Sequence, residues 1–273
     1  MSPGATHGPL HVRHWRRRTS EALGTLLCVH GLHEHSGRYD RLAGAVCDAG
    51  MDVVAADLIG HGRSPGRRGH IADFGADHLA AVDEMIAVAD EMGLSAPRYL
   101  LGHSLGGLIA ARWAQTHVAD IAGLVLITPF VAPRVEVPAW KRFLAFVLSG
   151  PLPAFSLETG VLDSDLFRDP VEETAYGADP LVQRRVSAGH WIAIGVEQKQ
   201  LMAEAERLTV PTLLLLAGED RIVSSDAARE LGQALPDVTV IEYPDAFHAL
   251  HADPLSGSVF ADLIEWVRGR SGA

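Results

Sequence analysis

Short apolar runs recur along the chain, and each is bounded by glycine, proline or aspartate. These runs are too short for buried helices and predict strands at 24–29, 52–56, 98–101, 124–127, 212–216 and 238–241. Amphipathic segments lie between them; the apolar positions of 74–89 share one helical face, and Gly93 supplies a stop. Strands that alternate with helices predict an α/β protein whose mostly parallel sheet is covered on both faces. A sheet of this kind binds ligands at the carboxyl ends of its strands.

The strand rhythm stops between residues 130 and 207. This stretch is rich in proline, and a structureless linker of such length is unusual inside a compact domain. We therefore expect a helical cap of residues 130–207, inserted over the strand ends. The expected core consists of residues 1–129 and 208–273.

Composition and charge restrict the partners and the location. The chain is 48% hydrophobic and 21% charged, and its net charge of −11 makes nucleic acid an unexpected partner. Cys28 and Cys47 are too few for a disulfide framework and are expected to be buried thiols. The basic cluster at 13–18 is expected to be a solvated edge. The amino end lacks the pattern of a signal peptide, and no apolar run approaches the roughly 18 residues of a membrane span, so we expect a cytoplasmic protein.

One serine lies in a glycine-rich turn directly after the run at 98–101. Gly102-His103-Ser104-Leu105-Gly106 matches the pattern G-x-S-x-G, and a helical pattern begins directly behind it. A tight strand-to-helix turn leaves no room for side chains at its glycines. It also presents the serine at the amino end of a helix, where unpaired N–H groups favour negative charge. We therefore predict that Ser104 is a nucleophile rather than part of an ordinary turn.

A serine hydroxyl needs a base that takes its proton and an acid that orients the base. In serine hydrolases built on such a sheet, the chain order is serine, acid, histidine. Asp220 follows the run at 212–216 and lies 220 − 104 = 116 residues after Ser104; His248 follows the last run, 248 − 220 = 28 residues further on. Both are therefore expected on the same edge of the sheet as Ser104. The alternatives are Glu219, Asp226 and Asp245 for the acid and His251 for the base.

Acyl transfer also needs N–H donors for the oxyanion. One donor is expected from Leu105, the residue after the nucleophile, and the other from Leu32, in the loop after the run at 24–29.

Three histidines in the same loop raise the alternative of a metal site. His30, His33 and His35 lie close together in HGLHEH. Metal hydrolases need several ligands at set spacings with acidic partners elsewhere, and no second cluster is clearly paired with this one. A structured oxyanion loop without metal is the favoured interpretation. His61 and His103 flank turns and are expected to brace them by hydrogen bonds.

Six stretches together resemble a known family: VHGLHEHSGRY (29–39), ADLIGHGRS (56–64), LLGHSLGG (100–107), DPL (179–181), LLAGEDRIV (215–223) and FHALH (247–251). They look like the α/β-hydrolase fold and, within it, the monoglyceride lipases and their lysophospholipase relatives. The resemblance covers nearly the whole chain from about residue 20, and HG-x-x-EHSGRY is its most specific part. It implies a triad of Ser104, Asp220 and His248, with Leu32 and Leu105 as oxyanion donors. It also implies cleavage of single-acyl glycerol esters under a helical cap, with neither a metal nor an organic cofactor.

One residue departs from the family pattern. His33 stands where the family usually has glycine. The imidazole adds bulk beside the oxyanion loop, so His33 is expected to touch the substrate and to alter the pocket for the alcohol.

Residues 139–148 are expected to form an amphipathic helix of the cap. An apolar stripe recurs at helical spacing: Trp140, Phe143, Leu144, Val147 and Leu148. The stripe either packs the cap onto the sheet or lines an acyl tunnel, in which case Phe143, Leu144 and Val147 contact the substrate. Lys141, Arg142 and Phe146 fall off the stripe and would then touch lipid surfaces transiently.

The sequence leaves two other functions open. The same fold also cleaves lysophospholipids and other small monoesters. A ligand-binding receptor that has kept the hydrolase residues would be of a different class. Ser104 argues against relatives with an aspartate nucleophile.

Overall fold

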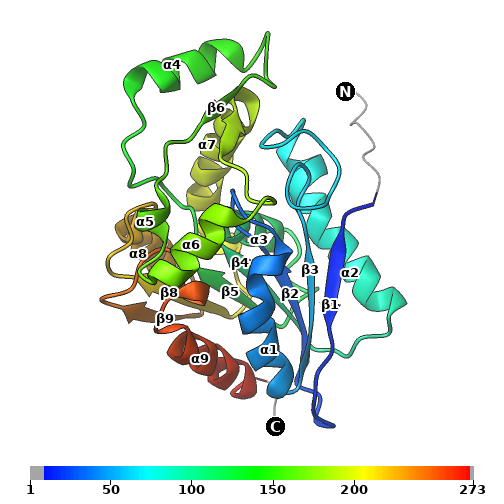
Figure 1. Cartoon of the computed structure of the whole chain (residues 1–273). Helices are drawn as coiled ribbons and strands as arrows, with labels where there is room; N and C mark the ends of the chain where they lie inside the picture. Colours follow the sequence, from blue (N-terminus) through cyan, green and yellow to red (C-terminus); the bar gives the residue numbers. More distant parts are fainter. Residues whose placement is uncertain (1–8, 271–273) are drawn as a thin grey trace.

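The computed structural model describes residues 9–270; the terminal residues 1–8 and 271–273 of the expected core lie outside the described part. Its main sheet has seven strands in the order β1-β3-β2-β4-β5-β8-β9 (Figure 1). Their bounds are β1 Val12–Trp15, β2 Gly24–Val29, β3 Met51–Ala56, β4 Arg98–His103, β5 Gly123–Ile127, β8 Thr212–Ala217 and β9 Val238–Tyr243. All neighbouring strands are parallel except β1, which runs antiparallel to β3. The predicted α/β sheet is confirmed, with β2 to β5, β8 and β9 at the six predicted runs.

Strand β1 (Val12–Trp15) overlaps the basic cluster at 13–18, for which the sequence predicts a solvated edge and no strand. Two arginines of this region pair with acids of the core instead. Arg17 Nη1 lies 2.6 Å from Asp52 Oδ2, and Arg13 Nη2 lies 2.7 Å from Asp40 Oδ1. The cationic side chains therefore fasten an edge strand to the sheet.

Helices cover both faces of the sheet, and the strand side chains alternate between two apolar clusters. One face packs on α2 (Ala80–Glu91), α3 (Leu105–Ala114) and α8 (Ser225–Ala234). The other packs on α1 (Asp40–Asp48) and α9 (Ser256–Arg268). The helix predicted over 74–89 begins with a π-helical turn, Gly75–Leu79, before α2. Cys28 and Cys47 are buried, as expected.

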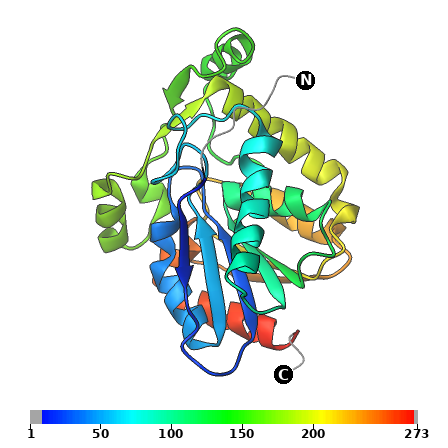
Figure 2. The same cartoon turned by 90° about the vertical axis from the view of Figure 1, so that its right-hand side faces the viewer.

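A long insertion separates β5 from β8 at the end of the sheet where the parallel strands finish (Figures 1 and 2). Its elements are α4 Ala139–Leu148, β6 Ser156–Glu158, α5 Asp163–Leu166, α6 Pro170–Ala178, β7 Arg185–Ser187 and α7 Ala188–Ala203. Strands β6 and β7 pair antiparallel in a separate two-stranded sheet, which the sequence did not predict. Within residues 9–270, no helix is both long and apolar enough to cross a bilayer.

Candidate active site

Ser104 lies in the turn that joins β4 to α3. Its backbone has φ 53° and ψ −118°, a region that side chains rarely adopt. A Cβ atom on Gly102 would lie 2.1 Å from the carbonyl oxygen of Gly106, and one on Gly106 would lie 2.1 Å from that of Val29. The glycines of the motif are therefore required by the close approach of three backbone segments, which holds the serine in a strained turn.

His248 and Asp220 are joined in the interior of the protein. His248 Nδ1 lies 2.8 Å from Asp220 Oδ2, and both side chains are buried. Asp220 Oδ1 accepts hydrogen bonds from the N–H groups of Ile222 and Val223, at 2.8 and 2.9 Å. Because an ionised carboxylate only accepts, the shared proton belongs to Nδ1 of the imidazole. Nε2 is then unprotonated and able to take a proton from a nucleophile.

The environment of Asp220 favours its ionised form. Burial alone would raise the pKa of this carboxyl group, but the His248 imidazole and the two backbone amides lower the pKa below its ordinary value. A charged Asp220 at neutral pH is what an imidazolium on His248 needs as a partner.

The alternative acids and the alternative base lie elsewhere. Glu219 and Asp245 are exposed, and Asp226, whose side chain is 89% exposed, pairs with Arg229. His251 is buried, but its Nε2 faces Glu34 at 3.5 Å. Among the candidates, the structure brings Asp220 and His248 together.

His30 fixes the peptide that carries the Leu32 N–H. Its Nδ1 donates to the carbonyl oxygen of Gly31 at 2.8 Å, and its Nε2 accepts from the N–H of Leu58 at 2.9 Å. Burial lowers the pKa of His30, which agrees with this neutral tautomer. The carbonyl of Gly31 and the N–H of Leu32 belong to one planar peptide and point in opposite directions. Holding the carbonyl therefore sets the direction of the N–H.

Gln183, in the insertion, fixes the next peptide of the same loop. Its Nε2 donates to the carbonyl oxygen of Leu32 at 2.9 Å, and its backbone N–H donates to that of His33 at 3.1 Å. Gln183 is not predicted from the sequence, because no local pattern marks a contact across 151 residues. The loop after β2 is thus held from the core on one side and from the insertion on the other.

His33 itself is half-buried and lines the pocket. Burial, followed by the nearby Arg184 cation, lowers its pKa to about 4, so the ring is neutral at pH 7. Its Nε2 is buried and has no hydrogen-bond partner among residues 9–270. The position is compatible with the expected contact to the substrate, which remains a prediction.

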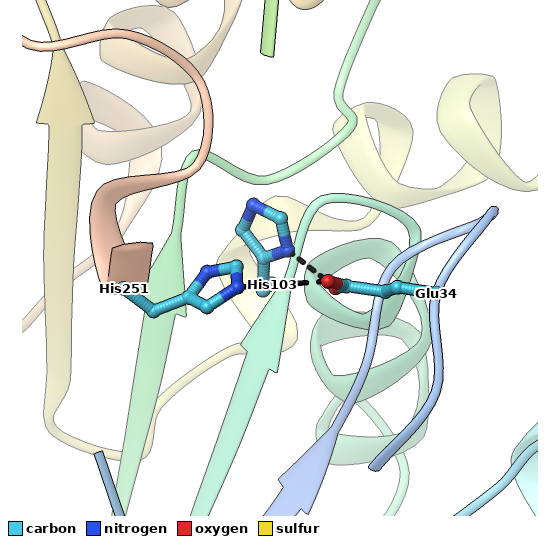
Figure 3. A group of neighbouring side chains, drawn as sticks. All are labelled: Glu34, His103 and His251. Atoms are coloured by element: carbon cyan, nitrogen blue, oxygen red, sulfur yellow. Dashed lines mark hydrogen bonds and ion pairs between the residues drawn. The ribbon is translucent and has the colours of Figure 1, made fainter. Parts of the chain in front are cut away.

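Glu34 stands at the centre of a buried polar network behind the nucleophile (Figure 3). Its Oε1 accepts from the Gly31 N–H at 2.7 Å and the Tyr39 hydroxyl at 2.7 Å, and it lies 2.9 Å from His103 Nδ1. His251 approaches the other oxygen. Burial alone would raise the pKa of Glu34, but His103 and His251 hold it well below its usual range. This carboxylate is not predicted as a site residue from the sequence, where its one local signal is its position between His33 and His35.

In the part of the chain that the structure describes, the same three side chains form a group that could hold a metal ion. One ligand atom each from Glu34, His103 and His251 lies within 4.8 Å of the others. Glu34 Oε1 already serves three donors, so the geometry fits a hydrogen-bond network that fixes the loop. Of the three histidines considered from the sequence, His30 bonds backbone groups and His35 Nε2 lies 2.9 Å from Asp179 Oδ2, whereas His33 lines the pocket.

Ser104 and His248 line one pocket between the strand ends and the insertion. The core residues that line it follow the carboxyl ends of β2, β4, β5, β8 and β9. The other walls are mostly apolar and include Val135, Val137, Leu144, Phe155, Leu157, Val161, Phe167, Tyr176, Val186 and Trp191. The pocket therefore combines a polar catalytic edge with walls suited to a hydrocarbon chain.

The prediction for the cap helix was wrong for two residues. Leu144 does line the pocket, together with Lys141 and Ala145. Phe143 and Val147 are instead 70% and 46% exposed and do not line it. Because α4 carries apolar side chains on both faces, helical spacing could not identify the inward face.

Comparisons with known proteins agree on the family. Residues 20–255 match the family described as serine aminopeptidase, S33. The human monoglyceride lipase is 37% identical over 96% of this chain and 88% of its own length. The monoacylglycerol lipase of Mycolicibacterium smegmatis is 31% identical over 89% of this chain and 88% of its own length. The crystal structure of a Paleococcus ferrophilus monoacylglycerol lipase, 32% identical, superposes with a TM-score of 0.86 over 96% of this chain and all of that one.

The family match over residues 20–255 includes strands β2 to β9, the insertion and every residue of the site. The chain therefore belongs to the serine aminopeptidase S33 family of α/β-hydrolases and is a monoglyceride lipase-like hydrolase of carboxylic esters.

Proposed function

We propose that the chain hydrolyses monoacylglycerols and similar single-chain esters through an acyl-enzyme. The observation that carries the proposal is one pocket with two kinds of wall: Ser104 and His248 on one side, apolar side chains on the other. The relatives named monoglyceride lipase support this substrate class.

In the proposed mechanism, the Ser104 hydroxyl attacks the ester carbonyl while His248 Nε2 takes its proton. Asp220 Oδ2 lies 2.8 Å from His248 Nδ1, accepts the hydrogen bond from it and stabilises the imidazolium. The N–H groups of Leu32 and Leu105 donate to the oxyanion; Leu105 opens α3, where the first N–H groups have no partner within the helix. His248 then returns the proton to the leaving alcohol. Water releases the fatty acid from Ser104 by the same steps.

Residues 130–207 serve in this proposal as a cap that holds the acyl chain. They supply most of the apolar lining, from Val135 to Trp191. Each buried methylene adds up to about 0.8 kcal/mol of binding free energy, so affinity should rise with chain length until the pocket is filled.

The cap also offers a surface for transient contact with lipid. Four large apolar side chains of α4 are exposed by 46 to 70%: Trp140, Phe143, Phe146 and Val147. Arg142 is exposed on the same helix. Apolar and cationic side chains on one helix suit the interface of a bilayer. A cytoplasmic enzyme with this helix would reach its substrates by binding the membrane peripherally.

A substrate panel tests the function. It runs from p-nitrophenyl acetate to long-chain monoacylglycerol, with triacylglycerol and lysophospholipid added. We expect the highest kcat/KM on monoacylglycerol, and a loss of roughly 10⁴-fold or more in Ser104→Ala, which should remain folded. A higher kcat/KM on lysophospholipid than on monoacylglycerol would show that the enzyme is a lysophospholipase. No turnover of any ester by purified wild-type protein would favour a ligand-binding receptor.

A further inference from the structure

Three arginines follow β3 in a loop that contains no acidic residue. Residues 60–69 read GHGRSPGRRG, and Arg63, Arg67 and Arg68 are exposed. Across the described residues, no hydrogen bond or ion pair engages these three guanidinium groups. Such a concentration of cations is unexpected in a chain with a net charge of −11.

Several other arginines of the chain pair with acids. Arg17 and Arg18, which also lie close together in sequence, pair with Asp52 and Asp48 at 2.6 and 2.8 Å. The arginines of the 60–69 loop instead present their charge to the surroundings, so the loop is suited to an anionic partner.

The loop is held in shape by its own backbone. The Gly60 N–H donates to the carbonyl oxygen of Pro65 at 2.8 Å, and the Ser187 N–H donates to that of Gly69 at 2.9 Å. Gly60 and Gly66 have φ of +71° and +102°, which side chains rarely adopt. Because the frame is fixed, the arginines are presented at a defined place and partner binding orders little backbone.

That place is the end of the molecule that carries α4. The bond from Ser187 ties the loop to β7, which pairs with β6. Lys141 of α4 donates to the carbonyl oxygen of Glu158, at the end of β6, at 3.1 Å. Both views show the loop and α4 at the same end of the molecule, beyond the carboxyl ends of the strands (Figures 1 and 2). The acidic neighbour on β6, Glu158, lies 3.9 Å from Arg185 and offsets little of this charge.

We propose that residues 63–68 form a second membrane contact, in which the arginines bind phosphate groups of anionic phospholipids while the exposed side chains of α4 enter the bilayer. The inference rests on the lipid contact proposed for the cap. Guanidinium groups bind phosphate oxygens through paired N–H donors. Two separate contacts fix the tilt of the protein, so that the pocket between the core and the insertion keeps one orientation to the lipid surface.

Vesicle binding tests the proposal. The Ser104→Ala protein is sedimented with vesicles of phosphatidylcholine alone and with vesicles that also contain phosphatidylglycerol. We expect tighter binding to the anionic vesicles, weakened by salt. Arg67→Glu should weaken that binding about five-fold or more, since a basic residue near an anionic surface contributes about 1 kcal/mol. The triple change Arg63→Glu, Arg67→Glu and Arg68→Glu should abolish the preference for anionic vesicles while leaving the weak binding to phosphatidylcholine.

Arg16→Glu is the matched control. It makes the same change in net charge at an exposed arginine, in the connection from β1 to β2 at the opposite end of the sheet. Equal weakening by Arg16→Glu and Arg67→Glu would overturn the proposal, as would equal binding of the parent protein to both vesicle types or to neither. The arginine variants are also made in the protein that retains Ser104. Their turnover of soluble esters shows that they are folded. If the wild-type protein turns over no ester of the substrate panel, the proposed function is refuted, and the result of the vesicle-binding experiment is unaffected.

Discussion

The two sides of the pocket are built by opposite physical means. On the core side, polar groups are buried and bonded from several directions: Asp220 accepts three hydrogen bonds, and Glu34 serves three donors through one oxygen. On the insertion side, α4 leaves most of its large apolar side chains in solvent, with Ala145 its one buried residue. Proton transfer and nucleophilic attack need the reacting atoms held in one geometry, whereas a hydrocarbon chain needs only an apolar surface of sufficient area. Substitutions should therefore act through geometry on the core side and through polarity on the insertion side.

The largest difference in kcat between a variant and its controls is expected at Asp220. Asp220→Asn keeps the shape but offers His248 an amide, which supports the wrong imidazole tautomer, so kcat should fall by roughly 10⁴-fold on every ester. Asp226→Asn and Asp245→Asn make the same change at exposed sites and should retain nearly full activity. Steady-state kinetics on a soluble ester decides the comparison, and a larger loss in either control would move the acid to that position.

A pair of neighbours on α4 tests the insertion side. Leu144→Asp puts a charge into the apolar wall and should lower kcat/KM on long-chain monoacylglycerol by roughly 100-fold, with little effect on p-nitrophenyl acetate. Phe143→Asp places the same charge on the exposed face and should leave turnover of p-nitrophenyl acetate unchanged while weakening vesicle binding. Equal losses on acetate and long-chain substrates in Leu144→Asp would show that α4 supports the site mechanically.

Gln183 joins the two sides, because an insertion residue holds the Leu32 peptide. Gln183→Ala should lower kcat by about 10-fold with KM nearly unchanged, since the bond fixes the peptide next to the oxyanion donor and does not hold the substrate. The control is Gln198→Ala, which removes another hydrogen bond from a side-chain amide of the insertion, from Gln198 Nε2 to the carbonyl oxygen of Phe130 at 2.9 Å. If both variants lose activity equally, Gln183 acts by holding the insertion in place and not by fixing the loop that carries Leu32.

The smallest expected effect is on stability at acid pH. Burial lowers the pKa of His190 to about 4, and His190 Nε2 lies 3.0 Å from His78 Nε2, a contact between α7 and the core. In the unfolded chain His190 has the ordinary histidine pKa of 6.5, so the unfolded state binds a proton more readily than the folded state. The stabilisation is complete above pH 6.5 and is lost as the pH falls toward 4.

The corresponding measurement is the melting temperature as a function of pH. His190→Gln should remove about 1 kcal/mol of the change in unfolding free energy between pH 7 and pH 5.5. An unchanged slope in the variant would mean that other buried histidines, such as His61 with its pKa lowered to about 3, carry the dependence.

The residues that sequence reasoning could place share one property: they follow parallel strands. Ser104, Asp220 and His248 each come directly after such a strand, so the topology alone predicts a common edge. Glu34 and Gln183 act through partners 69 and 151 residues away, at His103 and Leu32, and no local pattern encodes those contacts.

Elsewhere the local pattern was ambiguous or too short. In α4 the periodicity supports more than one inward face, because apolar residues lie all around the helix. Strand β1 has four residues and none is fully buried, so its apolar alternation was too weak to distinguish an edge strand from a solvated segment.

The most direct test of the account is covalent labelling of the nucleophile. A phosphonate ester with a long alkyl chain should react once per molecule, at Ser104, because among the serines of residues 9–270 this one alone combines the strained turn with the pocket that it shares with His248. Peptide mapping by mass spectrometry should find the label on Ser104 alone, and labelling should be lost in Ser104→Ala and strongly slowed in Asp220→Asn. A label on any other serine, or an unlabelled protein that still hydrolyses esters, would contradict the assignment.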